Sequence, residues 1–321
     1  GPEEVATLIS ALARSGTTRH FPTIITNSEN QILHSLKSIA QARKSSDFIA
    51  HSIPGIHLEG PFISTKEGPR GVHNPAYIRP ADIDEYRRWQ EAAEGLIQIV
   101  TLSPEDEQAL QFIRAVSADG VVVGIGHTQA PPEMIERAVA AGAQLSVHLG
   151  NGSPSMVPRL KNFIWRQLGE DRLRASLIAD GHHLPEEVLR CFIRGKGLEN
   201  TILISDAAPL AGSPPGLYQW GGMDVEIFDD GHMGLHNTEN LAGAAHLLDT
   251  GIAVTQKATS LSLADCVRLA TINPCRLTGL QTWTTAPHLG EPANIILFQY
   301  DNGELSVHKA IHHNNILFAR E

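Results

Sequence analysis

The sequence contains little that would build an extracellular framework or a membrane anchor. Its 321 residues include only three cysteines, Cys191, Cys266 and Cys275, with no CxxC pattern. An odd and widely spaced set favours a reducing compartment and buried, apolar cysteines over a disulfide framework. No apolar run approaches the roughly 18 residues of a membrane span. No signal peptide is visible, so we expect a cytoplasmic protein without membrane contact, although a helix-like segment, 3–14, directly follows Gly1 and the natural start need not be present.

Runs of positive charge are missing as well. The formal net charge is −10 and the isoelectric point is near 5.9, and no lysine or arginine run could neutralise a nucleic-acid backbone. The glycines around Gly221 lack the GxGxxG and GKS patterns that hold nucleotide phosphates, so they are expected in loops. These absences exclude a general nucleic-acid binder and leave a small molecule as the expected partner.

Short apolar runs alternate with amphipathic segments between about residues 17 and 271. This alternation is typical of βα units around a parallel sheet. Seven strands are predicted, at residues 18–26, 52–59, 96–102, 121–127, 144–148, 175–180 and 201–206. Helices are predicted at residues 31–44, 82–92, 105–116, 131–140, 185–194 and 241–256.

The predicted fold class is α/β, a TIM-type (β/α)8 barrel with a small β-sandwich appendage. Seven strands are one short of a closed barrel and the chain opens on a helix, so the first strand is expected to be missing. We assign residues 1–285 to the barrel. Within it, the Gly- and Pro-rich segment 211–222 and the alternating run that follows predict a long active-site loop with a hairpin. Residues 286–321 alternate again and are assigned to part of the β-sandwich.

Four of the apolar runs end in a side chain that can bind a metal or a proton: Glu59, His127, His148 and Asp206. The carboxyl ends of parallel strands in a barrel share one pocket, so these side chains are expected to meet although they lie far apart in the chain. One carboxylate and two imidazoles suit zinc or iron and leave a coordination position open. His57 shares the strand face of Glu59, one step deeper, and is expected to pack or to support a ligand.

An ordered series of motifs gives the chain a family resemblance. It resembles the N-acetylglucosamine-6-phosphate deacetylases of the amidohydrolase superfamily, through GTT at Gly16 and then HLEGPF, GHT, HLGN, IADGHHL, SDAAPLAG, PPGLYQWGG, LAG and ATINPCRLTGL. The resemblance covers most of the chain. It implies a (β/α)8 barrel with a small β-sandwich, a divalent metal, a homodimer and hydrolysis of an acetamide.

By this resemblance Glu59, His127 and His148 are the metal ligands and Asp206 is the catalytic aspartate. Zinc is the first choice of metal, with iron or another divalent ion as alternatives. One site is expected, and a second is left open because the family's His-x-His pair does not occur near the start of this chain. A carboxylate such as Asp206 could take a proton from water and then deliver it to the leaving nitrogen.

The substrate residues also follow from the resemblance, each with an alternative. His183 falls on the family's substrate histidine and is assigned a catalytic role, while His182, where the family more often has an apolar or smaller residue, is expected to pack. His73 either lies beside the sugar or is a surface loop histidine. Leu241, Ala242 and Gly243 are expected to line the sugar site, the alternative being packing at a helix start.

Phosphate recognition depends on a segment that departs from the family pattern. The chain reads HLGNGSP after the fifth predicted strand, where the family usually has HL-x-NAM. Asn151 and Gly152 keep the positions that contact substrate. Arg159 occupies the position of a phosphate-binding arginine that reaches the neighbouring subunit's site in family dimers. The alternative is a solvated arginine at the start of a helix at residues 160–168.

The leading hypothesis is therefore metal-dependent deacetylation of N-acetylglucosamine 6-phosphate. A second hypothesis keeps the chemistry but changes the substrate to another N-acyl sugar or an N-acyl amino acid. A third is a sugar-binding barrel without turnover, which the intact set of ligands and Asp206 disfavours. His308, His312 and His313 superficially resemble a metal cluster, but no acidic partner lies at a suitable spacing.

Overall fold

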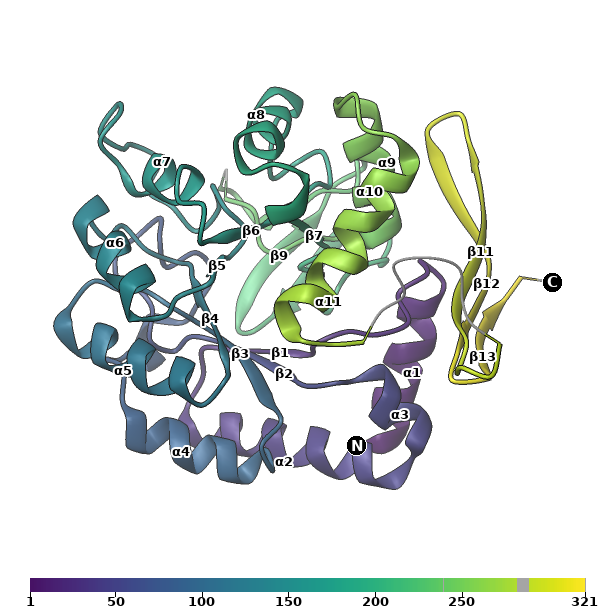
Figure 1. Ribbon diagram of the computed structural model, residues 1–321, viewed down its shortest axis with the longest axis horizontal. Helices are drawn as coiled ribbons and strands as arrows, with labels where there is room; N and C mark the ends of the chain where they lie inside the picture. The colour runs from purple at the N-terminus through teal and green to yellow at the C-terminus, as the bar shows by residue number, and fades with distance from the viewer. Residues whose placement is uncertain (239, 282–288, 321) are drawn as a thin grey trace.

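A computed structural model describes residues 1–238, 240–281 and 289–320 (Figure 1). Its centre is a seven-stranded sheet in which the spatial order follows the chain, and every neighbouring pair is parallel. The strands are β1 (Thr23–Ile25), β2 (Ile56–Glu59), β3 (Ile97–Leu102), β4 (Val122–Ile125), β5 (Leu145–Ser146), β6 (Arg174–Ile178) and β7 (Thr201–Ile204). The predicted parallel α/β sheet of seven strands is confirmed.

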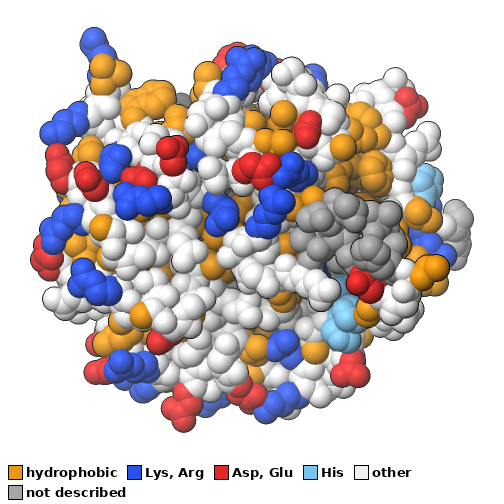
Figure 2. All heavy atoms as spheres, in the orientation of Figure 1, with side chains coloured by type: hydrophobic (Ala, Val, Ile, Leu, Met, Phe, Trp, Pro, Cys, Tyr) orange, Lys and Arg blue, Asp and Glu red, His pale blue; other side chains and the backbone are white. Residues whose placement is uncertain are grey.

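Helices pack around this sheet (Figure 1). They are α1 (Pro2–Ala13), α2 (Glu29–Ser45), α3 (Asp47–Ser52), α4 (Ile83–Ala92), α5 (Glu107–Ala118), α6 (Pro132–Ala141), α7 (Phe163–Leu168), α8 (Glu186–Lys196), α9 (Leu248–Ala258), α10 (Leu263–Ala270) and α11 (Ile272–Thr278), with short 3-10 turns at Pro75–Tyr77 and Leu198–Asn200. Asp82 and Asp106 cap α4 and α5 by accepting backbone N–H bonds. On the face in Figure 2, Lys and Arg side chains alternate with Asp and Glu.

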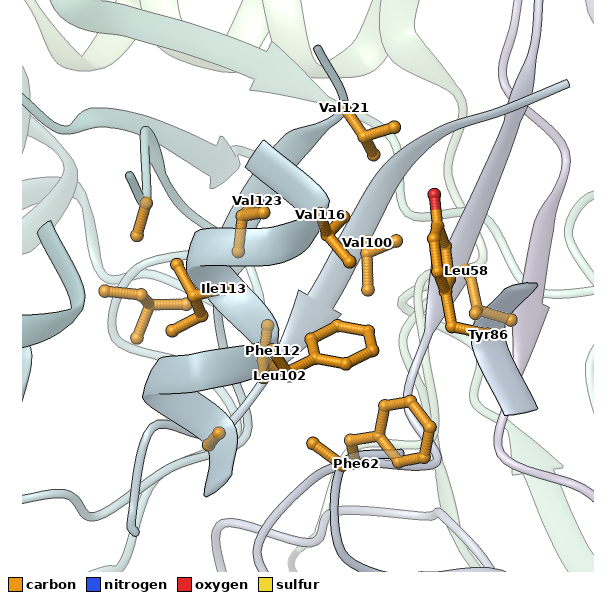
Figure 3. Close-up of a cluster of buried hydrophobic side chains, with 14 of the residues drawn as sticks. Leu58, Phe62, Tyr86, Val100, Leu102, Phe112, Ile113, Val116, Val121 and Val123 are labelled. Carbon is orange, nitrogen blue, oxygen red and sulfur yellow. The ribbon is translucent and has the colours of Figure 1, made fainter. Parts of the chain in front are cut away.

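Strand alternation separates an outer core from an inner one. Leu58, Val100 and Leu102 point away from the barrel and pack with Phe112 and Tyr86 of the covering helices (Figure 3). A second set packs on the inner side of the strands and comprises Ile99, Val122, Leu145, Val147 and Ile202. Because side chains alternate along a strand, His57 and Glu59 of β2 share the inner side.

Several predicted boundaries were wrong at the strand ends. His127, His148 and Asp206 follow β4, β5 and β7 instead of ending them, and their φ angles are 51°, 34° and 48°. A left-handed backbone cannot continue the ladder, so the strand stops before each of these residues. The predicted strand 52–59 also begins late, because Ser52 still belongs to α3.

The predicted helix at residues 241–256 was wrong over its first turns. Leu241 forms an antiparallel bridge with Gly234, and Ala244 forms a parallel bridge with Ala207. This tertiary pairing holds the segment extended, and α9 begins only at Leu248. Helix α7 likewise begins at Phe163, later than predicted, behind the capping side chain of Asn162.

The segment that we predict to be a long loop with a hairpin is a three-stranded antiparallel sheet. It contains β8 (Gly216–Trp220), β9 (Met223–Ile227) and β10 (Met233–Leu235), and the hairpin is β9–β10. Strand β8 was not predicted, because glycine and proline residues surround it and favour a loop. Gly221 and Gly222 form the β8–β9 turn with φ values of 60° and 81°, as expected for loop glycines.

The C-terminal appendage is a second three-stranded antiparallel sheet, of β11 (Asn294–Asp301), β12 (Glu304–His312) and β13 (Asn315–Ala319). It stands beside α1 and α9 (Figure 1), where Ala310 and Leu317 pack with Ile9 of α1. The domain boundary between residues 285 and 286 lies outside the described residues and stays a prediction.

The three cysteines differ in burial. Cys266 and Cys275 are buried as expected, but Cys191 is exposed on α8, because α8 turns this side chain away from the face that carries Leu189 and Phe192. Among the described residues, no helix is long and apolar enough to cross a membrane.

Candidate active site

The side chains of Glu59, His127 and His148 converge at the carboxyl ends of β2, β4 and β5, and we call them the inner cluster. Glu59 Oε1 lies 3.1 Å from His127 Nε2 and 3.0 Å from His148 Nε2, and the two Nε2 atoms are 3.1 Å apart. Their exposed fractions are only 5%, 8% and 2%. The three side chains therefore aim one atom each at a single buried point.

A backbone contact fixes which nitrogen of His127 faces this point. His127 Nδ1 lies 2.9 Å from the carbonyl oxygen of Pro69, which can only accept, so Nδ1 carries the proton. In the neutral ring, Nε2 is then an acceptor that faces the acceptor Oε1 of Glu59. Two buried acceptors at this distance need a cation or a proton between them, and a histidine held in this way is typical of metal ligands. The residues thus fit a bound metal ion.

The negative charge of Glu59 and the positive charge of the imidazoles stabilise each other. Burial acts to raise the pKa of the Glu59 carboxyl, but the hydrogen bonds and charges of His127 and His148 hold it well below its usual range. Burial likewise opposes protonation of His148, but the hydrogen bond and charge of Glu59 outweigh it and raise the pKa of that imidazole. The carboxylate is therefore ionised and able to bind a cation.

Asp206 lies beside the inner cluster in the turn after β7. Burial and the negative charge of Glu59 raise the pKa of its carboxyl, against the opposing charges of His148 and His183. Its left-handed backbone is a conformation that non-glycine residues rarely adopt, and such conformations gather at functional sites. The backbone N–H of Ala244 donates to its carbonyl oxygen at 3.3 Å, which ties this turn to the LAG segment.

His183 is held by a carboxylate that we had not predicted as a site residue. Asp180 Oδ2 lies 2.7 Å from His183 Nδ1, and Asp180 Oδ1 accepts the backbone N–H groups of His182 and His183 at 2.9 Å each. Burial would raise the pKa of Asp180, but the bonds and charge of His183 lower it to about 2. An aspartate three residues before the histidine was the sequence signal for this pair, and the other ring nitrogen stays available to a ligand.

His73 and His57 both lie near the inner cluster. His73 is buried at 4% exposure, so the alternative of a surface loop does not hold. Its Nδ1 lies 2.8 Å from Thr26 Oγ1 and its ring centroid is 4.4 Å from that of His127. With Glu59 and His127 it forms a group that could hold a metal ion. His57 is bonded to Thr101 at 2.7 Å, consistent with a supporting position.

The HLGN segment presents one unsatisfied amide and one close contact. The Nδ2 atom of Asn151 is buried without a hydrogen-bond partner in the described residues, which leaves a donor for a ligand. Gly152 has a φ of 55°, and a Cβ there would lie 2.9 Å from His127 Nδ1. Only glycine fits this approach to the His127 ring.

The remaining predicted residues lie farther out. Leu241, Ala242 and Gly243 form an extended connection between β10 and the Asp206 turn, where Ala242 donates to Met233 O at 3.0 Å and is fully buried. This connection is not a helix start. Arg159 is exposed on the segment between β5 and α7, where its carbonyl oxygen accepts from Trp165 Nε1 at 3.3 Å. The side chain of Arg159 is not brought to the inner cluster by any described contact.

The fold and the inner cluster define a metal-dependent hydrolase of the parallel α/β barrel class. The Amidohydrolase family model matches residues 3–317. The chain belongs to this family, and it is an enzyme that hydrolyses an amide bond.

Relatives of known activity cover most of the chain. It is 30% identical to the N-acetylglucosamine-6-phosphate deacetylase of Bacillus subtilis (strain 168), over 91% of this chain and 73% of that protein. It is also 30% identical to the N-acetylgalactosamine-6-phosphate deacetylase of Escherichia coli O157:H7, over 92% of this chain and 77% of the relative. A structure of a mutant N-acetyl-D-glucosamine-6-phosphate deacetylase of Mycobacterium smegmatis with N-acetyl-D-glucosamine-6-phosphate matches with a TM-score of 0.84 and 26% identity, covering 98% of this chain and 80% of that chain.

Proposed function

We propose that this enzyme removes the acetyl group from N-acetylglucosamine 6-phosphate and releases glucosamine 6-phosphate and acetate. The observation that carries the proposal is the convergence of Glu59, His127 and His148 beside Asp206 at one end of the barrel. The deacetylases among the relatives give the substrate class. In the reaction the C–N bond breaks, the acetyl carbon gains the oxygen of water and the nitrogen gains a proton.

The ligands in this proposal are Glu59, His127 and His148, with zinc as the first choice and one ion per site. The three donors, two imidazole nitrogens and one carboxylate oxygen, match the preferences of zinc. When bound, such an ion would polarise the acetamide carbonyl and lower the pKa of a water molecule. We propose His73 as a neighbour of the sugar, since its ring lies against His127.

Asp206 is proposed to carry the proton. A carboxyl whose pKa is raised by burial can hold the proton of the attacking water and then pass it to the leaving nitrogen. His183 is proposed to orient or polarise the acetamide oxygen through the ring nitrogen that Asp180 does not hold. Asp180 would act as a positioning residue that keeps the His183 ring in one orientation.

The sugar is proposed to lie between the Asn151–Gly152 turn and the segment 241–243. The unsatisfied amide of Asn151 gives it a donor, and the extended 241–243 segment lies next to the Asp206 turn. A second candidate substrate is N-acetylgalactosamine 6-phosphate, because the two kinds of relative match this chain with the same 30% identity. N-acyl amino acids are a more distant alternative.

The test is an acetate-release assay on the purified, zinc-loaded enzyme with four sugars. These are N-acetylglucosamine and N-acetylgalactosamine, each with and without a 6-phosphate. The proposal expects the highest kcat/KM for N-acetylglucosamine 6-phosphate. Preference for the galactosamine epimer would support the second candidate, and hydrolysis of none of the four sugars, with zinc bound, would overturn both.

Arg159 is proposed to bind the phosphate of substrate in the neighbouring subunit of a homodimer. It lies in an exposed segment with Met156, Leu160 and Trp165, whose exposed fractions are 87%, 76% and 48%. Exposed apolar side chains of this size are typical of a subunit contact. We further propose that the enzyme works in the cytoplasm, as its cysteine usage suggests.

Complementation between two inactive variants tests this dimer. Arg159→Ala and Asp206→Asn subunits are co-expressed with different tags, and the mixed dimer is isolated. If Arg159 acts across the interface, the site of the Arg159→Ala subunit contains its own Asp206 and the Arg159 of the Asp206→Asn subunit. Activity then returns at that site. Mixed dimers as inactive as either parent would place Arg159 in its own subunit's site or outside any site, and a monomer in sedimentation would overturn the dimer.

A further inference from the structure

Three histidines and one aspartate gather outside the inner cluster. We call this group the rim cluster: His182, Asp230, His232 and His246. It gathers three separate stretches of chain. His182 follows β6, Asp230 and His232 form the turn between β9 and β10, and His246 precedes α9. The sequence predicts no site here, since these residues form no spaced motif.

The rings of the rim cluster are packed against one another. The His182 ring stacks on that of His246 at 5.6 Å with 9° between planes, and it lies 5.5 Å from the His232 ring. Phe228 stacks on the other neighbour, His232, at 4.1 Å and 7°. Gly231 allows the turn to approach His246, because a Cβ there would lie 2.7 Å from His246 Nε2. The side chains are thus oriented by packing before any ligand is present.

We propose that the rim cluster binds one divalent transition-metal ion through His182, Asp230 and His232, separately from the inner cluster. One ligand atom from each of these residues lies within 4.8 Å of the others. Two imidazoles and one carboxylate favour zinc, nickel, cobalt or copper over magnesium or calcium, which prefer oxygen ligands. His246 stacks on the His182 ring and is not counted among the three ligands.

Asp230 and His232 contact each other at the rim and are open to solvent. His232 Nδ1 lies 2.5 Å from Asp230 Oδ1, so the other ring nitrogen and the second carboxylate oxygen remain available. Asp230 and His232 have side-chain exposures of 61% and 28%, so an ion can enter from solvent.

The site is physically distinct from the catalytic arrangement. His182 and His183 are adjacent in sequence, but His183 is held by Asp180 at 2.7 Å, whereas His182 stacks on His246. An ion at the rim would cross-link the β9–β10 turn to the segment after β6. It would therefore stabilise the attachment of the β8–β10 sheet to the barrel, in proportion to its saturation.

Equilibrium dialysis against zinc, with metal content measured per subunit, tests the proposal. The wild type is compared with Asp230→Asn and His232→Leu, both at partly exposed positions, and with His34→Leu as the matched control. His34 is an exposed histidine of α2, away from the cluster. We expect both rim variants to bind one zinc fewer than the wild type, and the control to bind the same number.

Two further measurements distinguish loss of the rim site from misfolding and from loss of the inner site. The thermal midpoint of the metal-free variants should equal that of the metal-free wild type, and the upward shift on adding zinc should shrink in the rim variants only. Cobalt should also give a visible absorption band in a His127→Ala, His148→Ala protein, where the inner cluster is disabled. Equal zinc content in wild type and rim variants, or no cobalt band in that protein, would overturn the proposal whether or not the enzyme deacetylates sugars.

Discussion

The inner cluster and the rim cluster use the same side-chain types but differ in burial. The inner side chains are at most 10% exposed and bring Glu59 Oε1 within 3.1 Å of both imidazoles. At the rim, Asp230 is 61% exposed on its side chain, and water can solvate the ligand atoms. Burial of facing acceptors is costly without a cation, so the inner cluster depends on its ion much more than the rim cluster does.

The causes of the pKa shifts in the two clusters also differ with burial. At the inner cluster, burial is the largest influence on the pKa of Glu59, His148 and Asp206. Hydrogen bonds and neighbouring charges outweigh burial at Glu59 and His148, whereas burial itself sets the raised pKa of Asp206. At the rim, the hydrogen bond of His232 is the largest influence on Asp230. Low solvent access therefore lets burial shift the pKa of a carboxyl such as Asp206, whereas at the exposed rim a single hydrogen bond is the main influence.

The largest expected effect separates proton transfer from ion binding. Asp206→Asn removes the proposed proton carrier but none of the ligands of either cluster. We expect kcat for acetate release to fall by about 10²–10⁴-fold, while the number of zinc ions per subunit stays unchanged. Full activity in Asp206→Asn with zinc bound would refute the proposed mechanism.

A smaller loss is expected from Asp180→Asn. Asparagine can still accept the backbone N–H groups of His182 and His183, but it loses the charge that holds the His183 ring. We expect kcat to fall by about 10–100-fold, as for other residues that orient a functional histidine, with little change in KM. The acid limb of the pH–rate profile should move, and Asp180→Glu should recover part of the rate. A change in thermal stability alone, with kcat preserved, would assign Asp180 a structural role.

Acid should destabilise the folded protein through the buried imidazole of His312. Burial lowers the pKa of His312 from 6.5 to about 4, helped by His313, Arg19 and His51, against a hydrogen bond to the carbonyl oxygen of His51. The unfolded chain therefore binds more protons between pH 6.5 and 4, so stability is full above 6.5 and is lost as the pH falls. Between pH 7 and 5 His312 should cost about 2 kcal/mol of unfolding free energy.

The measurement is urea unfolding of the metal-free protein at several pH values. His312→Gln should flatten the dependence on pH, since glutamine cannot take up a proton. An identical slope in His312→Gln and wild type would show that His312 does not stay neutral in the folded state.

The smallest change in activity is expected from a rim variant. His232→Leu removes a rim ligand without touching Asp206 or the inner cluster. We expect kcat/KM for acetate release to stay within about twofold, below 0.5 kcal/mol, although one zinc per subunit is lost. A tenfold loss of kcat together with that zinc would join the two clusters into one functional unit.

Much of the architecture could be predicted because it depends on local pattern. The seven apolar runs, the helices between them and the hairpin after β7 all follow from periodicity and turn residues. The errors occurred where tertiary pairing competed with local preference. Residues 241–247 have a helix-compatible pattern, but bridges from Gly234 and Ala207 keep them extended.

The candidate site was predictable to a similar degree. Glu59, His127, His148 and Asp206 could be selected because each follows an apolar run, and parallel strands bring such ends together. Asp180 also follows an apolar run, but only the folded contact shows that it holds His183. The rim cluster was missed because its members come from three distant stretches. The phosphate contact of Arg159 stays a prediction, because its exposed side chain would need a second subunit.

By itself, the sequence determined the order of the strands and the chemical identity of the side chains at their ends, since both follow from the local alternation of apolar and polar residues. Only the tertiary structure decided that Glu59, His127 and His148 share one buried point, that Asp180 holds His183 and that His182 meets Asp230 and His232. The physical reason is that pKa values and ligand geometry depend on burial and on distances of a few ångströms between remote residues. Those quantities exist only after the chain has folded.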